Sequence, residues 1–394
     1  MRSICTLLLA GPFLALAACA DEGSSPVTAR DASAPVLAAS ENGQGIPGQY
    51  IVVLKDGADP RSVAAVAGVS PKYIYTAALN GFAGALNAGQ LNALQHNPSV
   101  AYIEQDQVMS VATTQSNATW GIDRVDQRAL PLSKTFTYLN TGVGVNAYII
   151  DTGIRYDHAE FGGRAVKGFD AVTAGGTAAD CQGHGTHVAG TVGGTTWGVA
   201  KAVKLYSVRV LDCSGSGTSS GVAAGMDWVA ANHVKPAVAN MSLGGGGSTV
   251  IDDATRRMIA AGVSTTIAAG NGNLVGIAQD ACNYSPARVA EGITIGATTS
   301  SDAKASYSNY GNCVDFFAPG SSITSADYSS TTGSKVLSGT SMAAPHVAGA
   351  AALFLQSRPG ATPQQVRDSL YANTTKGIVT SSKTANNHLL FTSY

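Results

Sequence analysis

Apolar residues from Trp120 to the C-terminus alternate between two spacings. Short runs rich in β-branched residues predict buried strands, and longer stretches with apolar positions three and four residues apart predict helices. The predicted strands are Val143–Ile150, Lys204–Leu211, Ala237–Met241, Gly262–Ala268 and Gly292–Gly296. The predicted helices are Thr186–Gly193, Ser219–Ala231, Ile251–Ala261 and Met342–Ser357. This alternation predicts an α/β fold in three layers, with a mostly parallel sheet covered by helices on both faces.

A smaller set of strands and helices precedes this region. Strands are predicted at Gln49–Lys55, Gly81–Asn87 and Val100–Val111, and helices at Pro60–Ala67 and Ala88–His96. We expect residues 46–111 to form a small α+β domain and residues 112–394 a larger domain. A small unit of about 65 residues is marginally stable alone, so we expect it to lean on a partner surface. Residues 21–45, rich in Ala, Ser, Gly and Pro, are expected to be a flexible leader.

Composition narrows the classes of partner. The chain has 394 residues, of which 12% are charged, and its net charge is −1. A nucleic-acid-binding protein usually carries a basic surplus, which this chain lacks. We therefore expect no nucleic-acid partner.

The first twenty residues have the pattern of an export signal. Arg2 precedes an apolar stretch from Ile4 to Ala18, and small residues follow. The stretch is shorter than the ~20 residues that span a bilayer, so a cleaved signal is the better interpretation. Two cleavage modes fit: ordinary cleavage after Ala20, or lipobox cleavage at Leu16-Ala17-Ala18-Cys19, which would leave an acylated Cys19. Both predict an exported protein.

Four cysteines remain outside the signal: Cys181, Cys213, Cys282 and Cys313. An oxidising compartment allows two disulfides, and spacing alone leaves three pairings open. A metal site is the weaker alternative, because no CxxC motif or Cys/His cluster is present.

The first segment with candidate chemistry is a strand that runs into Asp151-Thr152-Gly153. In a parallel sheet, ligand sites lie beyond the carboxyl ends of the strands, so Asp151 is placed for a functional role. A helix cap or a turn is the alternative interpretation.

The second segment is Gly183-His184-Gly185-Thr186-His187. The flanking glycines leave His184 room to project from the start of a helix. Zinc is disfavoured, because the two histidines are three residues apart rather than four and no Glu lies between them.

The third segment is Gly339-Thr340-Ser341-Met342-Ala343, followed by an apolar helix. Ser341 is expected at a helix N-terminus, where unpaired N–H groups favour nearby negative charge. A simple N-cap is the alternative. An α/β-hydrolase elbow is disfavoured, because Ala343 occupies the place of its second glycine.

Together these segments have the chain order Asp, His, Ser, which is that of subtilisin. The sequence resembles the subtilases, and among them the proteinase K branch, with the closest likeness to aqualysin-like enzymes. The likeness extends from about Thr119 to the C-terminus. It includes the phrases Val208-Arg-Val-Leu-Asp212, Asn240-Met-Ser-Leu-Gly244 and Tyr284-Ser-Pro-Ala287.

The resemblance implies a subtilisin-like fold and a secreted serine endopeptidase of broad specificity. Ser341 would be the nucleophile, His184 the general base, and Asp151 the group that orients His184. Ala268-Ala-Gly-Asn271 matches the oxyanion segment of the family, so the Asn271 amide and the Ser341 backbone N–H would stabilise the oxyanion. No catalytic cofactor is expected. The alternative is a non-catalytic binding module with the same fold.

The resemblance also implies how polypeptide substrates bind. Two segments would hold the substrate as an added strand, and a third would wall the pocket for the residue before the cleaved bond. Uncharged or apolar residues are expected in that pocket. The residues concerned are Gly215, Ser216 and Gly217, then Ser242, Leu243 and Gly244, then Ala268, Ala269 and Gly270.

Disulfides and calcium follow from the same resemblance. The pairs would be Cys181–Cys213 and Cys282–Cys313. Calcium would be bound by the Asp315 carboxylate and by the carbonyls of Ala290 and Gly292, where the family has Pro and Val. A second site would use Asp123, Asp126 and Gln127, with Ser133 where some relatives carry an acidic ligand.

The small domain resembles the subtilase propeptide, with a ferredoxin-like α+β fold. It would template folding and act as an intramolecular inhibitor, and the enzyme would cut itself free between Ala112 and Gln115. The protein is expected to be a secreted monomer. If Cys19 is acylated, only the precursor would be anchored, and this cleavage would release the protease.

Overall fold

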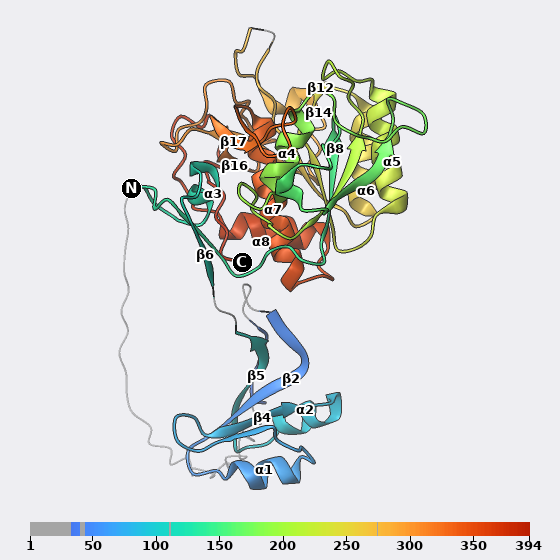
Figure 1. The fold of residues 1–394 in the computed structure, drawn as a ribbon. Helices are drawn as coiled ribbons and strands as arrows, with labels where there is room; N and C mark the ends of the chain where they lie inside the picture. Colours follow the sequence, from blue (N-terminus) through green and yellow to red (C-terminus); the bar gives the residue numbers. More distant parts are fainter. Residues whose placement is uncertain (1–32, 40–43, 110–111, 274) are drawn as a thin grey trace, which may run out of the picture. The chain divides into compact units, whose positions relative to one another are not determined.

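The computed structural model describes residues 33–39, 44–109, 112–273 and 275–394 (Figure 1). The predicted export signal, with Cys19, lies outside these residues, as does most of the predicted leader. Among the described residues, no helix is both long and apolar enough to cross a membrane. The described residues divide into two compact units, one with Ser33–Leu37 and Gly48–Glu104, the other with those of 38–47 and of 105–394.

The small unit is a five-stranded sheet with two helices. Its strands are β1 (Val36–Leu37), β2 (Gln44–Leu54), β3 (Tyr73–Tyr75), β4 (Gly81–Ala85) and β5 (Val100–Val108), in the sheet order β1-β5-β2-β4-β3. Helices α1 (Pro60–Val66) and α2 (Ala88–Gln95) complete a β-α-β-β-α-β chain order from β2 to β5. This order confirms the ferredoxin-like prediction. The short β1, which pairs parallel to β5, was not predicted.

The large unit is built on a seven-stranded sheet in the order β16-β15-β13-β11-β8-β10-β9. Every neighbouring pair in this sheet is parallel, which confirms the predicted architecture. The strands are β8 (Asn146–Asp151), β9 (Ala165–Asp170), β10 (Lys204–Arg209), β11 (Ala237–Met241), β13 (Ser264–Ala268), β15 (Ile293–Thr298) and β16 (Phe316–Pro319).

Strand β8 shows how the sequence produces two helical layers. All six of its residues are buried, and alternate side chains point to opposite faces. Tyr148 and Ile150 pack with the layer of α5 (Ser219–Asn232) and α6 (Thr249–Ala260). Ala147 and Ile149 pack with the layer of α4 (His184–Gly193), α7 (Thr340–Ser357) and α8 (Pro363–Asn373). Figure 1 shows α5 and α6 together beside one face of the sheet.

Smaller elements complete the large unit. They are α3 (Trp120–Val125), the paired strands β6 (Thr113–Ser116) and β7 (Thr135–Tyr138), β12 (Gly245–Gly246) with β14 (Tyr284–Ser285), β17 (Ile323–Ala326) with β18 (Ser334–Leu337), and two 3-10 helices, Ala159–Phe161 and Ala281–Asn283. Two disulfides, Cys181–Cys213 and Cys282–Cys313, confirm the expected pairing.

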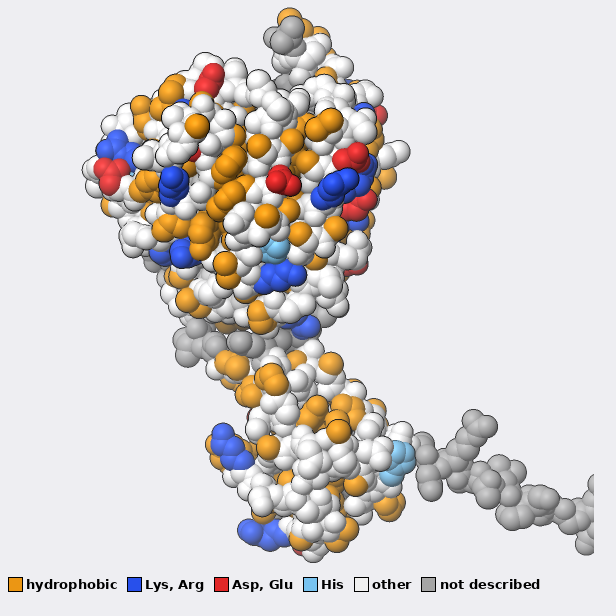
Figure 2. All heavy atoms as spheres, turned by 90° about the vertical axis from the view of Figure 1, so that its right-hand side faces the viewer, with side chains coloured by type: hydrophobic (Ala, Val, Ile, Leu, Met, Phe, Trp, Pro, Cys, Tyr) orange, Lys and Arg blue, Asp and Glu red, His pale blue; other side chains and the backbone are white. Residues whose placement is uncertain are grey.

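Charges are distributed thinly over the surface. Figure 2 shows Lys, Arg, Asp and Glu side chains scattered singly or in mixed pairs over the face it presents. That face carries no broad patch of one sign, in keeping with the near-neutral net charge of the chain.

Candidate active site

Asp151 is the last residue of β8 and is completely buried. Its Oδ1 accepts a hydrogen bond from the Thr152 backbone N–H at 2.7 Å and contacts His184 Nδ1 at 2.8 Å. Its Oδ2 is buried without a hydrogen-bond partner among the described residues. A buried carboxylate with a spare acceptor favours a positive charge beside it, and the His184 ring is the group that can supply one.

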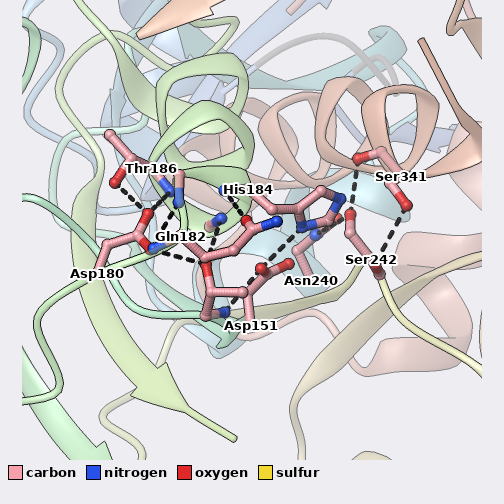
Figure 3. A network of polar contacts seen from close by, with 11 residues as sticks. Asp151, Asp180, Gln182, His184, Thr186, Asn240, Ser242 and Ser341 are labelled. Carbon is pink, nitrogen blue, oxygen red and sulfur yellow. Dashed lines mark hydrogen bonds and ion pairs between the residues drawn. The ribbon is translucent and has the colours of Figure 1, made fainter. Parts of the chain in front are cut away.

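His184 is the first residue of α4, two residues earlier than the predicted start of this helix. Gly183 supplies the N-cap with φ of +111°, a left-handed conformation that favours glycine. The buried carboxylate of Asp180 fixes this turn. Its Oδ1 accepts the backbone N–H groups of Gln182 and Gly183, both at 2.9 Å, and its Oδ2 accepts the backbone N–H of Thr186 at 3.0 Å and the Thr186 hydroxyl at 2.6 Å. Figure 3 shows the His184 ring lying between the hydrogen bonds around Asp180 and Ser341.

The charge state of His184 follows from these neighbours. Burial lowers the pKa of the imidazole, but the Asp151 charge, the Asp151 hydrogen bond and the Asp180 charge outweigh burial and raise the pKa above 6.5. The side chain is still 24% exposed, so its outer edge is open to a substrate. A neutral ring with Nδ1–H on Asp151 leaves Nε2 free to accept a proton.

Ser341 lies in the first turn of α7, whose N-cap is Gly339, so the simple N-cap interpretation of Ser341 is wrong. Its Oγ donates to the Ser242 carbonyl at 3.1 Å, and Ser242 Oγ donates to the Ser341 carbonyl at 2.7 Å. Among the described residues no hydrogen bond joins Ser341 to His184. In substrate-free enzymes such bonds are often long and tighten only when substrate binds.

Asn271 follows β13 and lies beside the start of α7. Its Oδ1 accepts the Thr340 backbone N–H at 2.8 Å and the Thr340 hydroxyl at 2.9 Å. These contacts orient the amide so that Nδ2 donates to no described residue. The amide donor therefore remains available on the wall of a cavity that Asn271 shares with Ser341.

Two neighbouring cavities collect the residues that the resemblance assigned to substrate. One, of about 550 Å³, is lined by His184 and by both predicted strand-binding segments, 215–217 and 242–244. The other, of about 310 Å³, is lined by Ser242–Gly244, Ala268–Asn271 and Ser341. The remaining lining residues of the second cavity, Gly245, Gly246, Gly272, Tyr284, Ser285, Ala287, Asn309 and Thr340, include no charged side chain.

The predicted calcium ligand Asp315 is already engaged. Its Oδ1 accepts Arg367 Nη2 at 2.5 Å and Nε at 3.2 Å, and its Oδ2 accepts the Thr294 backbone N–H at 2.7 Å. Burial raises the pKa of Asp315 even though Arg367 and Thr294 act in the opposite direction. A guanidinium therefore occupies the carboxylate that calcium would need. Calcium binding by Asp315 with the carbonyls of Ala290 and Gly292 would therefore require Arg367 to give up this carboxylate, and the site stays a prediction.

Several residues of this site were not singled out from the sequence. Asp180 lies four residues before His184, and Thr340 directly before Ser341, but neither spacing indicates a contact. Asn240 supports Ser242 by donating from Nδ2 to its hydroxyl at 2.8 Å. Only the fold brings these side chains together.

The fold and the site define a serine hydrolase of the Asp-His-Ser type. A model of the subtilase family matches residues 142–391, and a model described as peptidase inhibitor I9 matches residues 49–112. The chain belongs to the subtilase family.

Individual relatives agree with this assignment. The extracellular serine proteinase of Thermus sp. (strain Rt41A) is 52% identical over 407 residues, which cover 97% of each chain. Alkaline serine exoprotease A of Vibrio alginolyticus is 52% identical over 324 residues, or 81% of this chain and 59% of that relative. The crystal structure of a cold adapted subtilisin-like serine proteinase matches with a TM-score of 0.67 and 54% identity, covering 71% of this chain and 100% of that one.

Proposed function

We propose that this chain is the precursor of a secreted serine endopeptidase that uses Asp151, His184 and Ser341. The observation that carries the proposal is the buried Asp151 carboxylate on His184 Nδ1, at 2.8 Å, beside a cavity that holds both Ser341 and Asn271. Secretion is supported by the extracellular relative, which is similar over nearly its whole length. Anchoring of the precursor through Cys19 is a separate hypothesis, and the mass of the membrane-associated precursor tests it.

The proposed reaction is hydrolysis of a peptide bond by Ser341, His184 and Asp151. Ser341 Oγ attacks the scissile carbonyl while His184 Nε2 takes its proton. The Asp151 carboxylate stabilises the imidazolium, and His184 returns the proton to the leaving amine. Asn271 Nδ2 and the Ser341 backbone N–H donate hydrogen bonds that stabilise the negative charge on the oxyanion. In the second half of the reaction, water attacks the acyl group on Ser341 while His184 acts as base, and the acyl group leaves as a carboxylic acid.

Substrate binding is proposed at the two cavities. An extended peptide would lie between Gly215–Gly217 and Ser242–Gly244, where backbone pairing gives affinity without reading sequence. The residue before the cleaved bond would enter the uncharged cavity walled by Ala268–Gly270. Burying a charge there without a partner is costly, so we expect broad specificity with a preference for uncharged residues.

Residues 46–111 are proposed as the inhibitor propeptide, in agreement with the inhibitor match at 49–112. The peptidase domain would comprise residues 112–394, with self-cleavage between Ala112 and Gln115. The enzyme is proposed to act as a monomer.

We propose that calcium binds near Asp126. Asp126 Oδ1 is buried without a partner among the described residues, while its Oδ2 accepts the Thr137 backbone N–H at 2.6 Å. Burial, with a smaller effect from the Asp123 charge, raises the pKa of Asp126 to about 6. A spare carboxylate oxygen next to a second carboxylate suits a cation that prefers oxygen ligands, and Gln127 lies in the same loop.

Removing the Asp126 charge tests this site. The unfolding temperature is measured on the inactive Ser341→Ala precursor, which cannot digest itself, with calcium and with a chelator. We expect calcium to stabilise this parent by about 2–3 kcal/mol at one hundred times its dissociation constant, and Asp126→Asn to abolish that gain. In the presence of chelator, Asp126→Asn should be at least as stable as the parent, because the variant no longer buries the Asp126 carboxylate charge. Retention of the gain by Asp126→Asn contradicts the site, and the exposed Asp253→Asn is the matched control.

Cleavage of peptides tests the proposed activity. Peptide anilides that differ only in the residue before the anilide are offered to the mature enzyme. We expect faster cleavage after Ala, Leu and Phe than after Asp or Lys, and loss of cleavage with Ser341→Ala. If the Ser341→Ala variant cleaved these peptides as fast as the wild type, the proposed serine protease activity would be contradicted.

A further inference from the structure

Asn309 is a fully buried asparagine beside the segment that presents Asn271. Its side chain makes three hydrogen bonds to that segment and to the loop that follows it. Oδ1 accepts the backbone N–H groups of Gly272 at 3.0 Å and Gln279 at 2.8 Å. Nδ2 donates to the Ala269 carbonyl at 2.9 Å. The oxygen of this amide thus accepts two hydrogen bonds and its nitrogen donates one, all to residues 269–279.

The backbone of Asn309 adds a fourth contact, because its N–H donates to the Gly270 carbonyl at 2.9 Å. The residues held by Asn309 are therefore Ala269 and Gly270 before Asn271, and Gly272 after it. Asn271 itself is exposed, and among the described residues its hydrogen bonds are those from Thr340. The position of the Asn271 backbone thus depends on its neighbours, which Asn309 fixes on both sides.

The fit between Asn309 and this segment is close. Gly270 has φ of +101°, and a Cβ built there would lie 2.4 Å from Asn309 Nδ2. No other residue can take this conformation without strain and also leave the amide in place. The close approach of the Asn309 amide therefore requires a glycine at 270.

We propose that Asn309 is a positioning residue that holds the Asn271 amide at the place where the oxyanion forms. The inference rests on the proposed function, since it needs Asn271 to be an oxyanion donor. It extends that function to a residue that does not touch the substrate carbonyl. Electrostatic stabilisation of this kind requires a donor that is already oriented, and a misplacement of about 1 Å can cost on the order of 10²-fold in rate.

A double-mutant cycle tests the coupling between Asn309 and Asn271. Asn271→Ala, Asn309→Ala and the double variant are compared with the wild type as mature enzymes. Variants that fail to process themselves are matured with a trace of wild-type protease, which is then removed. Active sites are counted by titration with a serine-directed phosphonate, so that kcat refers to folded enzyme only. The substrate is a peptide anilide with an apolar residue before the anilide.

We expect Asn271→Ala to lower kcat by roughly 10²–10³-fold and Asn309→Ala by roughly 10–100-fold, with KM nearly unchanged. In the Asn271→Ala background, Asn309→Ala should lower kcat by less than about twofold, because there is no donor left to position. Equal losses in both backgrounds would overturn the inference, as would an unchanged kcat in the single variant.

Two further variants separate this role from a merely structural one. Asn146→Ala removes another buried asparagine, whose Nδ2 bonds to the Val234 carbonyl at 3.0 Å at the opposite end of β8. It should lower stability and leave kcat unchanged. If Asn309→Ala does not fold, Asn309→Ser undergoes the same cycle. Should Asn271→Ala itself leave kcat unchanged, the oxyanion proposal fails; should only Asn309→Ala leave it unchanged, the positioning role alone fails.

Discussion

In the proposed mechanism the His184 imidazole accepts a proton from Ser341, and two buried carboxylates act on this ring. Asp151 bonds to its Nδ1, and the Asp180 charge lies close enough to contribute to its raised pKa. Only the neutral ring can act as base, so activity is present above the pKa of His184 and is lost as the pH falls through it.

The direction of this pH dependence leads to a prediction about the pH profile of the enzyme. We expect the acid limb of kcat/KM to have its midpoint above pH 6.5. Asp180→Asn should move that midpoint toward lower pH by roughly 0.3–1 unit, because one negative charge near the ring is removed. The control is Asp253→Asn on the exposed surface of α6, which should leave the profile in place. A midpoint that does not move with Asp180→Asn would exclude an electrostatic role for that residue.

Residues with a local signature could be found from the sequence, and residues without one could not. Asp151, His184 and Ser341 each lie at the boundary of an apolar element, with glycine close by. Their segments could therefore be recognised as candidate site segments from the sequence. Asn309 lies 37 positions from Gly272 along the chain, and its contacts depend on how two loops meet. No spacing rule predicts such a contact. Nor does any spacing rule predict the hydrogen bonds by which Asp180 stabilises the turn before His184.

At the scale of the element, α4 and α7 each bury a histidine in the core. His187 Nε2 donates to the carbonyl of Ile323 at 3.0 Å, and its Nδ1 has no partner among the described residues. His346 Nδ1 donates to the Met342 carbonyl at 2.8 Å. Burial lowers the pKa of each ring to about 4. Both rings are therefore neutral in the folded protein at pH 7.

These histidines should make the fold sensitive to acid. Between pH 6.5 and 4 the unfolded chain binds protons that the folded chain excludes, so the free energy of unfolding falls as the pH falls. The full effect is about 3 kcal/mol for each ring. Denaturant unfolding of the Ser341→Ala precursor as a function of pH measures it. His346→Gln should reduce the slope, and the half-exposed His233→Gln should not; equal slopes in all three proteins would contradict this account.

The central elements were predicted closely, and the edges of the sheet were missed. Strand β11 matches its predicted bounds, because its five residues are all buried and apolar or nearly so. Strands β9 and β16 were not predicted, and they form the two edges of the seven-stranded sheet. β9 contains Lys167 and Gly168, and β16 has four residues and ends at Pro319. Edge strands are often short or polar, which weakens the pattern.

At the scale of the whole molecule, Arg367 on α8 ties the C-terminal part of the chain to Asp315 before β16. Arg367→Ala would leave a largely buried carboxylate without its cation. We expect a loss of about 1–3 kcal/mol in the free energy of unfolding, less than the ~3–5 kcal/mol of a fully buried pair, because Arg367 is 29% exposed. Denaturant unfolding in the Ser341→Ala background measures the loss.

Two comparisons make this prediction specific. Arg256→Ala breaks the exposed Arg256–Asp253 pair and should cost less than about 0.5 kcal/mol. Asp315→Asn added to Arg367→Ala should recover part of the stability, since the uncompensated charge is gone. A neutral effect of Arg367→Ala would contradict a stabilising role for the Arg367–Asp315 ion pair.

Two separate sets of predicted strands and helices indicated two folded units, and the structure divides into two units between Glu104 and Gln105 rather than at the predicted residue 112. The resemblance identified the family and the disulfide pairing, but it did not indicate that Arg367 contacts the predicted calcium ligand Asp315. A likeness of motifs fixes Asp315, whereas the partner on that carboxylate comes from α8, a helix that was not predicted. Contacts made by an unpredicted element lie beyond what a motif can indicate.

The most direct test of the account is the intact mass of the purified precursor over time, beside its Ser341→Ala form. We predict that only the wild type is cut, between Ala112 and Gln115, and that the Ser341→Ala precursor stays whole under the same conditions. Cleavage of both forms at the same position, or of neither, would contradict self-processing by an Asp151–His184–Ser341 protease.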